Sequence, residues 1–328
     1  MAEAETSPPP LPAASAASAS ALPAASGGAA PSTEVEGTAA SSLAASATEE
    51  IKIPLHPTLN DPTITDAEKD GLAKLRAALV DCKDASGLLY SLDTRLVKYL
   101  RAREADVEKA ATFFKTSLEF RQKNGYMPDL LLAEFKPPKE IFTHVSVFPV
   151  PIFHDKEGNP VVYNRAGLMY GKKICAKLGT ETVCKSFAWF LEHLTRSVTA
   201  NIATHPMAAP YVTLILDLNG FGSHCLGPLN CTIALLNVFQ NLYPETLKRC
   251  MLVNSPWIFR AAWAVISPFI DKRVKEKISI LRGSATDTIF KYVAPSQVPA
   301  FMGGKMIEDG DEFCGKSILP NGDPYAGE

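Results

Sequence analysis

The sequence predicts an α/β fold in which a small all-helical N-terminal lobe precedes a β-sheet that helices partly cover on each side. Three observations support this prediction. Short helical patterns fill residues 65–125, strands alternate with helices from about residue 145, and some of these strands are apolar on both faces. About 270 residues lie outside a polar N-terminal segment, which is enough for a substantial core.

Residues 1–50 differ from the rest of the chain in composition. They are mostly Ala, Ser, Pro, Gly and Thr, and they include six Glu but no Lys or Arg. Such a segment cannot bury enough apolar surface to offset the entropy of ordering it, so we expect a disordered tail. The segment also lacks the basic start of a secretory signal and the arginines of a transit peptide, which favours a cytoplasmic protein.

The charge of the chain narrows the possible partners. Without the six Glu of the tail, the formal net charge changes from −2 to about +4. This is too weak for a nucleic-acid-binding protein, but it suits transient contact with an anionic membrane surface. The seven Cys form no C-x-x-C pair and the six His show no ligand spacing, so we expect reduced thiols and no metal. No apolar run is long enough to cross a bilayer.

The N-terminal lobe, which we place at residues 51–125, is predicted to contain three helices. The second covers residues 93–103, with Asp93 as its N-cap. The third follows the cap Asp106 and ends near Gly125, because glycine readily adopts the left-handed conformation at a helix end. The first is recognised by leucines at helical spacing: Leu72, Leu75 and Leu79.

The second domain, placed at residues 126–310, alternates strands and helices and leaves residues 311–328 as a C-terminal extension. Strands are predicted at residues 145–152, 161–165, 211–220, 247–254 and 277–281. Helices are predicted at residues 180–200, around 235–239, at 257–270 and at 285–292.

Motifs for catalysis are mostly absent. Gly220 and Gly222 follow a strand, but the third glycine of a dinucleotide fingerprint would fall on Cys225. The chain has no P-loop and no G-x-S-x-G hydrolase motif. We therefore predict that the protein is not an enzyme. The alternative of an enzyme depends on a cluster that is close in sequence only: Asp217, Ser223 and His224.

The helix predicted at residues 257–270 is apolar nearly all round and contains two of the three Trp. Such a helix is either fully buried or faces something apolar that is not protein. Asn254 and Pro256 break the chain before it, and Pro268 and Asp271 mark its end, which suits a segment that can swing. Exposing each large apolar side chain to water would cost about 1.5–3 kcal/mol, so a swung-out state would need a membrane.

Six segments over residues 65–305 resemble the CRAL-TRIO lipid-binding family, and specifically its phosphatidylinositol-transfer branch. The resemblance implies a CRAL-TRIO-type mixed β-sheet and a mobile gate helix, here 257–270, that together form a pocket for one bound phospholipid, with no other cofactor. The segments are LVKYLRAREADVEKA (96–110), DKEGNPVVY (155–163), LILDLNGFG (214–222), YPETLKRCMLVNSPWIF (243–259), PFIDKRVKEKISIL (268–281) and VPAFMGGK (298–305).

The resemblance also implies which residues hold the headgroup. The Arg of the L-R-A-R motif, the Glu of Y-P-E and the Lys after the gate match Arg103, Glu245 and Lys277. Arg and Lys can neutralise a phosphodiester, and Glu can accept hydrogen bonds from inositol hydroxyls. The gate residues expected to contact the membrane are Trp257, Ile258, Phe259, Trp263, Ile266 and Phe269.

Several positions depart from the family pattern. Val274 replaces a Thr, so one hydrogen bond to the headgroup is missing or replaced. Val212 and Leu214 replace the Ser and Thr of members that also bind phosphatidylcholine, which favours a less polar and still unidentified second lipid. Leu216 and Leu218 stand where haem-binding relatives have His and Tyr, which argues against haem.

Taken with the resemblance, the sequence predicts a cytoplasmic, peripherally membrane-associated monomer that binds and transfers phosphatidylinositol. Presentation of that lipid to a lipid kinase is a variant of the same function. Two alternatives stay open, namely a carrier of a small hydrophobe (tocopherol, retinoid or sterol) and a lipid-regulated scaffold.

Overall fold

A computed structural model describes residues 64–82, 87–138, 141, 154–204, 211–305, 307–308 and 311–312. The chain divides into two units, Met1–Glu50 and Ile51–Glu328, and all described residues belong to the second. The tail expected at residues 1–50 and the strand expected at 145–152 lie outside the described residues, as does most of the expected extension at 311–328.

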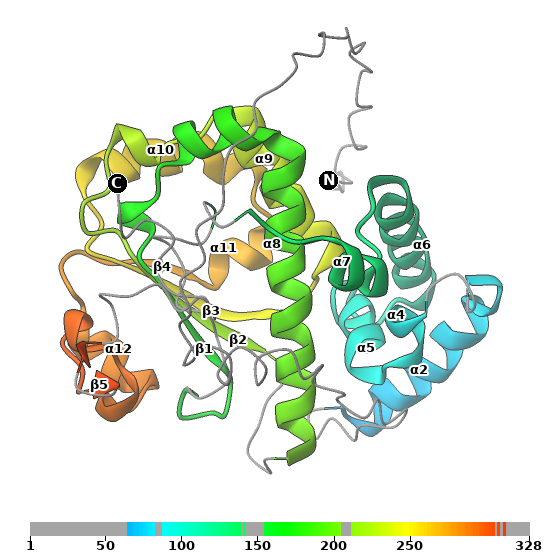
Figure 1. Ribbon diagram of the computed structural model, residues 1–328. Helices are drawn as coiled ribbons and strands as arrows, with labels where there is room; N and C mark the ends of the chain where they lie inside the picture. The colour runs from blue at the N-terminus through cyan, green and yellow to red at the C-terminus, as the bar shows by residue number, and fades with distance from the viewer. Residues whose placement is uncertain are drawn as a thin grey trace, which may run out of the picture. The chain divides into compact units, whose positions relative to one another are not determined.

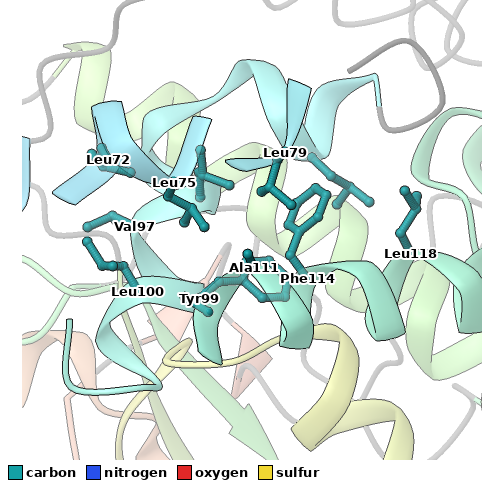
Figure 2. Close-up of a cluster of buried hydrophobic side chains, with 12 residues drawn as sticks. Leu72, Leu75, Leu79, Val97, Tyr99, Leu100, Ala111, Phe114 and Leu118 are labelled. Atoms are coloured by element: carbon teal, nitrogen blue, oxygen red, sulfur yellow. The ribbon is translucent and has the colours of Figure 1, made fainter. Parts of the chain in front are cut away.

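The first part of the described chain is helical. It contains α2 (Asp66–Ala78), η1 (Val80–Cys82), α4 (Leu88–Ser91), α5 (Asp93–Arg101), α6 (Val107–Asn124) and α7 (Pro128–Glu134). Figure 2 shows the leucines of α2 facing aromatic and aliphatic side chains of α5 and α6, which form one buried cluster. Burial of these apolar faces against one another is what stabilises such short helices, which are marginal in isolation.

The predicted ends of α6 are confirmed. The backbone N–H of Lys109 donates to the Asp106 side chain at 3.0 Å, and Gly125 closes the helix at a φ of 70°. The predicted cap of α5 is wrong by one residue, because Asp93 is the first residue of α5 and Leu92 occupies the cap position. The Asp93 carboxylate instead accepts a hydrogen bond from Arg76 at 2.5 Å, which joins α5 to α2.

Four strands form a parallel sheet in the order β1-β2-β3-β4: β1 (Val161–Asn164), β2 (Val212–Asp217), β3 (Leu247–Val253) and β4 (Ile278–Ile280). These are the four predicted strands that lie within the described residues, and their existence is confirmed. The described antiparallel contacts are two isolated bridges and a separate pair, β5 (Ile307–Glu308) and β6 (Asp311–Glu312).

Helices join and cover these strands, as Figure 1 shows, which confirms the α/β class. Gly179, at a φ of 76°, breaks α8 into a short first segment and a long second one. Only the long segment after Gly179 was predicted from the sequence. The elements are α8 (Gly171–Thr204), α9 (Leu229–Leu242), α10 (Trp257–Ile266), α11 (Lys272–Glu276) and α12 (Thr286–Tyr292), with 3₁₀ turns η3 (Ala166–Leu168), η4 (Ser223–Cys225), η5 (Ser267–Phe269), η6 (Pro295–Gln297) and η7 (Ala300–Met302).

The two faces of the sheet differ in how tightly they are covered. On one face Tyr163, Ile215 and Met251 stand side by side across β1, β2 and β3 and pack against α12 and the turns after it. These side chains are fully buried. The opposite face looks toward α8 and α10 and is less completely covered, so the functional site is sought there.

Candidate functional site

Two rows of apolar side chains form the less covered face of the sheet. The strand register places Leu214, Cys250 and Ile278 side by side, and Leu216, Leu252 and Ile280 in the next row. Residues two apart on a strand point to the same face, so the six side chains form one surface, which we call the apolar floor. They belong to one cluster with Phe259 and Trp263 of α10.

Most of this floor is only partly buried. Leu214, Leu216, Ile278 and Ile280 keep some accessible surface, whereas Ile215 on the opposite face is 0% exposed. Protein interiors are normally packed to the density of organic crystals. A row of partly buried aliphatic side chains beneath helices is therefore a surface with unused contact capacity, suited to an apolar ligand.

Helices α8 and α9 add apolar walls beside the floor. Phe190 and Leu191 of α8 pack against Leu214 and Val212, and Phe187 of α8 meets Phe239 of α9 with ring centroids 5.9 Å apart. Val212 is fully buried under α8 and does not belong to the floor, while Leu214 belongs to both groups. Of the two positions that depart from the phosphatidylcholine-binding pattern, Leu214 is thus the one on the floor.

The apolar helix α10 covers the floor with one side and exposes apolar side chains on the other. Phe259 is 7% exposed and packs toward the sheet, but Trp257 is 74% exposed and Phe269 in η5 is 45% exposed. Full burial, the simplest reading of its sequence, is therefore excluded. The structure also separates the six residues expected at the gate, since Phe259 faces the floor while Trp257 and Phe269 face outward.

The N-terminal end of α10 is anchored to the carboxyl edge of the sheet. Asn254 follows β3 with a φ of 53°, and its side-chain amide donates to Asp217 at the end of β2 at 2.8 Å. The backbone N–H groups of Asn254 and Ser255 donate to Gly283 and Leu281 beyond β4. These bonds give α10 a fixed starting point on three neighbouring strands.

Glu245 and Lys277, two of the three residues expected at the headgroup, form an ion pair. The Lys277 ammonium lies 2.7 Å from a Glu245 carboxylate oxygen, and both side chains are about three-quarters buried. Glu245 has a φ of 45°, a conformation that non-glycine residues adopt only at an energetic cost. Lys277 follows α11 directly and precedes β4.

Arg103 lies near the other end of α11. Its guanidinium stacks over the Phe113 ring at 4.0 Å and donates to the Ala102 carbonyl. Burial lowers the pKa of Arg103, the neighbouring Arg273 lowers it further, and Asp271 acts in the opposite direction. The structure thus brings Arg103 to the start of α11, while the Glu245–Lys277 pair lies at its end.

Arg273 lies between Arg103 and the Glu245–Lys277 pair, and it was not predicted from the sequence. Its guanidinium donates to the carbonyls of Arg101 at 3.2 Å and Ala102 at 2.9 Å, at the C-terminal end of α5. Lys277 caps the end of α11 four residues after Arg273, so the two residues lie on the same face. The four-residue spacing of these two cations within the sequence DKRVKEK is the pattern that could have pointed to Arg273.

A small pocket lies beside the Y-P-E segment, lined by Lys98, Arg121, Tyr243 and Thr246 among others. It holds about 290 Å³, a figure that includes open space at its mouth. Leu89, Leu242 and Pro244 also line it, so the pocket is mixed in character and too small to hold an acyl chain.

The cluster that could have supported an enzyme does not come together. Asp217 accepts hydrogen bonds from the Asn219 backbone and the Asn254 side chain, and the His224 ring lies against Tyr170, with centroids 5.0 Å apart. Ser223 is exposed. Each member therefore has a different environment.

Within the residues that the structure describes, no helix has the length and apolar character that crossing a bilayer requires. Over the same residues, no group of three His, Cys, Asp or Glu side chains is arranged to hold a metal ion.

Comparison with known proteins points to one family. The family model for the CRAL/TRIO domain matches residues 147–304. The CRAL-TRIO domain-containing protein T23G5.2 of Caenorhabditis elegans is 29% identical over 225 residues, which are 66% of this chain and 30% of the worm protein. Protein real-time of Aedes aegypti is 28% identical over 221 residues, 65% of this chain and 33% of that protein. Patellin-6 of Arabidopsis thaliana is 28% identical over 215 residues, 65% of this chain and 51% of the plant protein.

A solved structure agrees with this assignment at the level of the fold. The crystal structure of Sfh5 matches with a TM-score of 0.53 at 17% sequence identity, covering 70% of this chain and 84% of that one. The chain spans between about a third and a half of the length of the curated relatives named above.

Proposed function

We propose, from the match of residues 147–304 to the family model of the CRAL/TRIO domain, that the protein binds a single phospholipid, takes phosphatidylinositol as its ligand, and exchanges it with membranes. The function proposed is carriage of a lipid and involves no catalysis. Presentation of the lipid to a lipid kinase would use the same site.

The partly buried apolar floor beneath α10 is the observation that carries this proposal. Taking two acyl chains out of a bilayer forfeits about 0.8 kcal/mol per methylene group. Only an enclosed apolar surface can offset a loss of that size, because a patch open to water would leave most of each chain hydrated. The partly buried rows that contain Leu214 and Leu216, with α10 above them, support the proposal of such a surface.

The charges around α11 support a phosphorylated headgroup. Arg103 lies near the start of α11, Arg273 is on this helix and Lys277 caps its end. Glu245 is the carboxylate paired with Lys277. A phosphodiester could take the place of Glu245 on Lys277, which leaves that carboxylate to accept hydrogen bonds from inositol hydroxyls. Because the two charged groups lie 2.7 Å apart, this exchange of partners requires only small side-chain movements.

A second ligand should be less polar than phosphatidylcholine. Leu214 on the floor and Val212 beside it are aliphatic where members of the family that also bind phosphatidylcholine have hydroxyl side chains. A buried headgroup without hydrogen-bond partners is strongly disfavoured. A sterol, tocopherol or retinoid fits this surface better, and such a ligand found alone would replace the phosphatidylinositol proposal.

Contact with the membrane would use the outward side of α10 and η5. Trp257, Val265 and Phe269 expose large apolar surfaces there, and Lys272 follows them in an exposed position. Apolar side chains beside a cation are typical of surfaces that dock on anionic bilayers.

Lipid analysis of the purified full chain tests the proposal. Native mass spectrometry should find one phosphatidylinositol per protein, and vesicle-to-vesicle transfer of that lipid should collapse in Lys277→Glu. The matched control is Lys275→Glu, an exposed residue on the same helix, which should transfer normally. Finding only a sterol or tocopherol would reject phosphatidylinositol as the ligand of this site. Normal transfer by Lys277→Glu would reject the role of Lys277 in holding the headgroup.

A further inference from the structure

A side chain of α9 makes two hydrogen bonds at the C-terminal end of the α10–η5 segment, where the Ile270 side chain is also buried. The Gln240 amide nitrogen donates to the Phe269 carbonyl at 3.1 Å, and its oxygen accepts from the Asp271 backbone N–H at 2.6 Å. These two backbone groups belong to the residues on either side of Ile270. One amide therefore makes both hydrogen bonds that an extended strand would make at this position. We call this pair of bonds the Gln240 clamp.

The clamp lies at the junction of two helical segments. Ile270 is extended, with φ −100° and ψ 130°, between η5 and α11. Asp271 begins α11, because its carboxylate accepts from the Arg273 backbone N–H at 2.8 Å. A single extended residue between two helices is where a change in φ and ψ can rotate one segment without disturbing the other.

The two ends of the α10–η5 segment are held in different ways. At the N-terminal end, backbone groups of Asn254 and Ser255 bind backbone beyond β4, so that end is part of the sheet. At the C-terminal end, the bonds come from a side chain on a neighbouring helix, and they lie near solvent. Water can replace bonds of the second kind without unfolding any strand.

From this asymmetry we propose that Gln240 is a positioning residue for lipid exchange. While the clamp is closed, α10 lies over the apolar floor. When the clamp opens, the segment rotates about its anchored N-terminal end and uncovers the floor. The inference rests on the proposed function for its consequence, but the clamp itself is defined by two hydrogen bonds that can be tested without any lipid.

Three variants of the full chain separate the clamp from general packing. Gln240→Leu keeps a side chain of similar size and removes both bonds. Gln240→Glu keeps the acceptor for the Asp271 N–H and removes the donor to Phe269. Asn241→Leu is the control, because consecutive residues on a helix point about 100° apart.

The hydrogen-exchange rate of the Asp271 amide in the lipid-free full chain tests directly whether the clamp forms. In Gln240→Leu, the Asp271 amide should exchange on the order of tenfold faster, the effect of removing its acceptor. Gln240→Glu should retain protection at Asp271, and Asn241→Leu should match the wild type. Equal protection of Asp271 in Gln240→Leu and wild type would overturn the clamp.

The rate of lipid transfer tests whether the clamp controls lipid exchange. Transfer between vesicles should be severalfold faster in Gln240→Leu than in wild type and unchanged in Asn241→Leu. Faster exchange at Asp271 with unchanged transfer would show that the clamp does not control lipid exchange. If the wild-type protein itself transfers no lipid, the proposed function fails, and protection at Asp271 still decides whether the clamp exists.

Discussion

The carboxylate of Glu192 in α8 binds the guanidinium of Arg95 in α5 at 2.7 Å, and both side chains are buried. The second Glu192 oxygen lies 3.1 Å from Arg121 of α6. One buried carboxylate therefore connects two helices of the N-terminal lobe to the long helix beside the sheet. Arg121 also donates to the carbonyls of Tyr126 and Leu242, which extends the connection to the end of α9.

Removing this carboxylate should destabilise the protein strongly. We expect Glu192→Gln to lower the free energy of unfolding by about 3–5 kcal/mol, because it leaves two buried guanidinium groups without their carboxylate. Urea denaturation measures the loss. The control is Glu181→Gln on the same helix. Glu181 is exposed and pairs with Lys185, so this variant should change the free energy of unfolding by less than about 1 kcal/mol. A similar small loss in Glu192→Gln would contradict the structural role of this connection.

The same group predicts how stability depends on pH. Burial alone would raise the pKa of Glu192, but Arg95 and Arg121 outweigh it and lower the pKa from 4.5 to about 2. A lowered folded-state pKa adds stability above the unfolded-state value, and this contribution is lost as the pH falls from about 4.5 to about 2. Over that range the wild type should lose on the order of 3 kcal/mol more than Glu192→Gln. Parallel pH profiles of the two proteins would contradict the lowered pKa.

This connection also illustrates what the sequence could not predict. Glu192 and Arg95 are 97 positions apart, and each reads as an ordinary helix-surface charge in its own segment. Strands, the capping of α6 by Asp106 and its end at Gly125 were predictable, because alternation and cap chemistry are local properties. Which charges face inward depends on how helices pack, and local patterns contain no information on that.

The candidate site divides in the same way. The structure pairs Glu245 with Lys277, a contact that the chain positions alone did not give. Their role at a headgroup stays a prediction. Arg273 and Gln240 were missed because each acts on a backbone group of a distant segment. The apolar pattern of α10 was visible in the sequence, but the division into a covered side and an exposed side required the fold.

Exchanging the partners of the Glu245–Lys277 pair should separate stability from lipid binding. The double variant Glu245→Lys with Lys277→Glu restores an ion pair, so its free energy of unfolding should lie within about 1 kcal/mol of the wild type. Each single variant should be less stable, because two like charges then face each other. Phosphatidylinositol transfer should stay lost in the double variant, since the cation no longer follows α11. Recovery of transfer in it would mean that the pair acts only through its mutual attraction.

The thiol of Cys175 should react slowly with alkylating reagents. It lies 2.7 Å from the sulfur of Cys231 in α9, and burial, together with that contact, raises its pKa to about 12. Because the thiolate is the reactive form, alkylation by iodoacetamide should accelerate about tenfold per pH unit between pH 7 and 10. Peptide mass spectrometry follows the reaction at Cys175, and Cys175→Ser identifies its signal. A rate that levels off near pH 8 would contradict the raised pKa.

The two sides of α10 should respond differently to alanine. Phe259 packs on the apolar floor, so Phe259→Ala should lower the free energy of unfolding by about 3 kcal/mol or more, as for other buried aromatic residues. Trp257 is 74% exposed, so Trp257→Ala should leave the free energy of unfolding within about 0.5 kcal/mol of the wild type. Its loss should instead reduce binding to anionic vesicles severalfold, measured by vesicle sedimentation, because an exposed indole makes its largest contact with the bilayer surface. Unchanged vesicle binding by Trp257→Ala would show that the outward side of α10 is not the surface that meets the membrane.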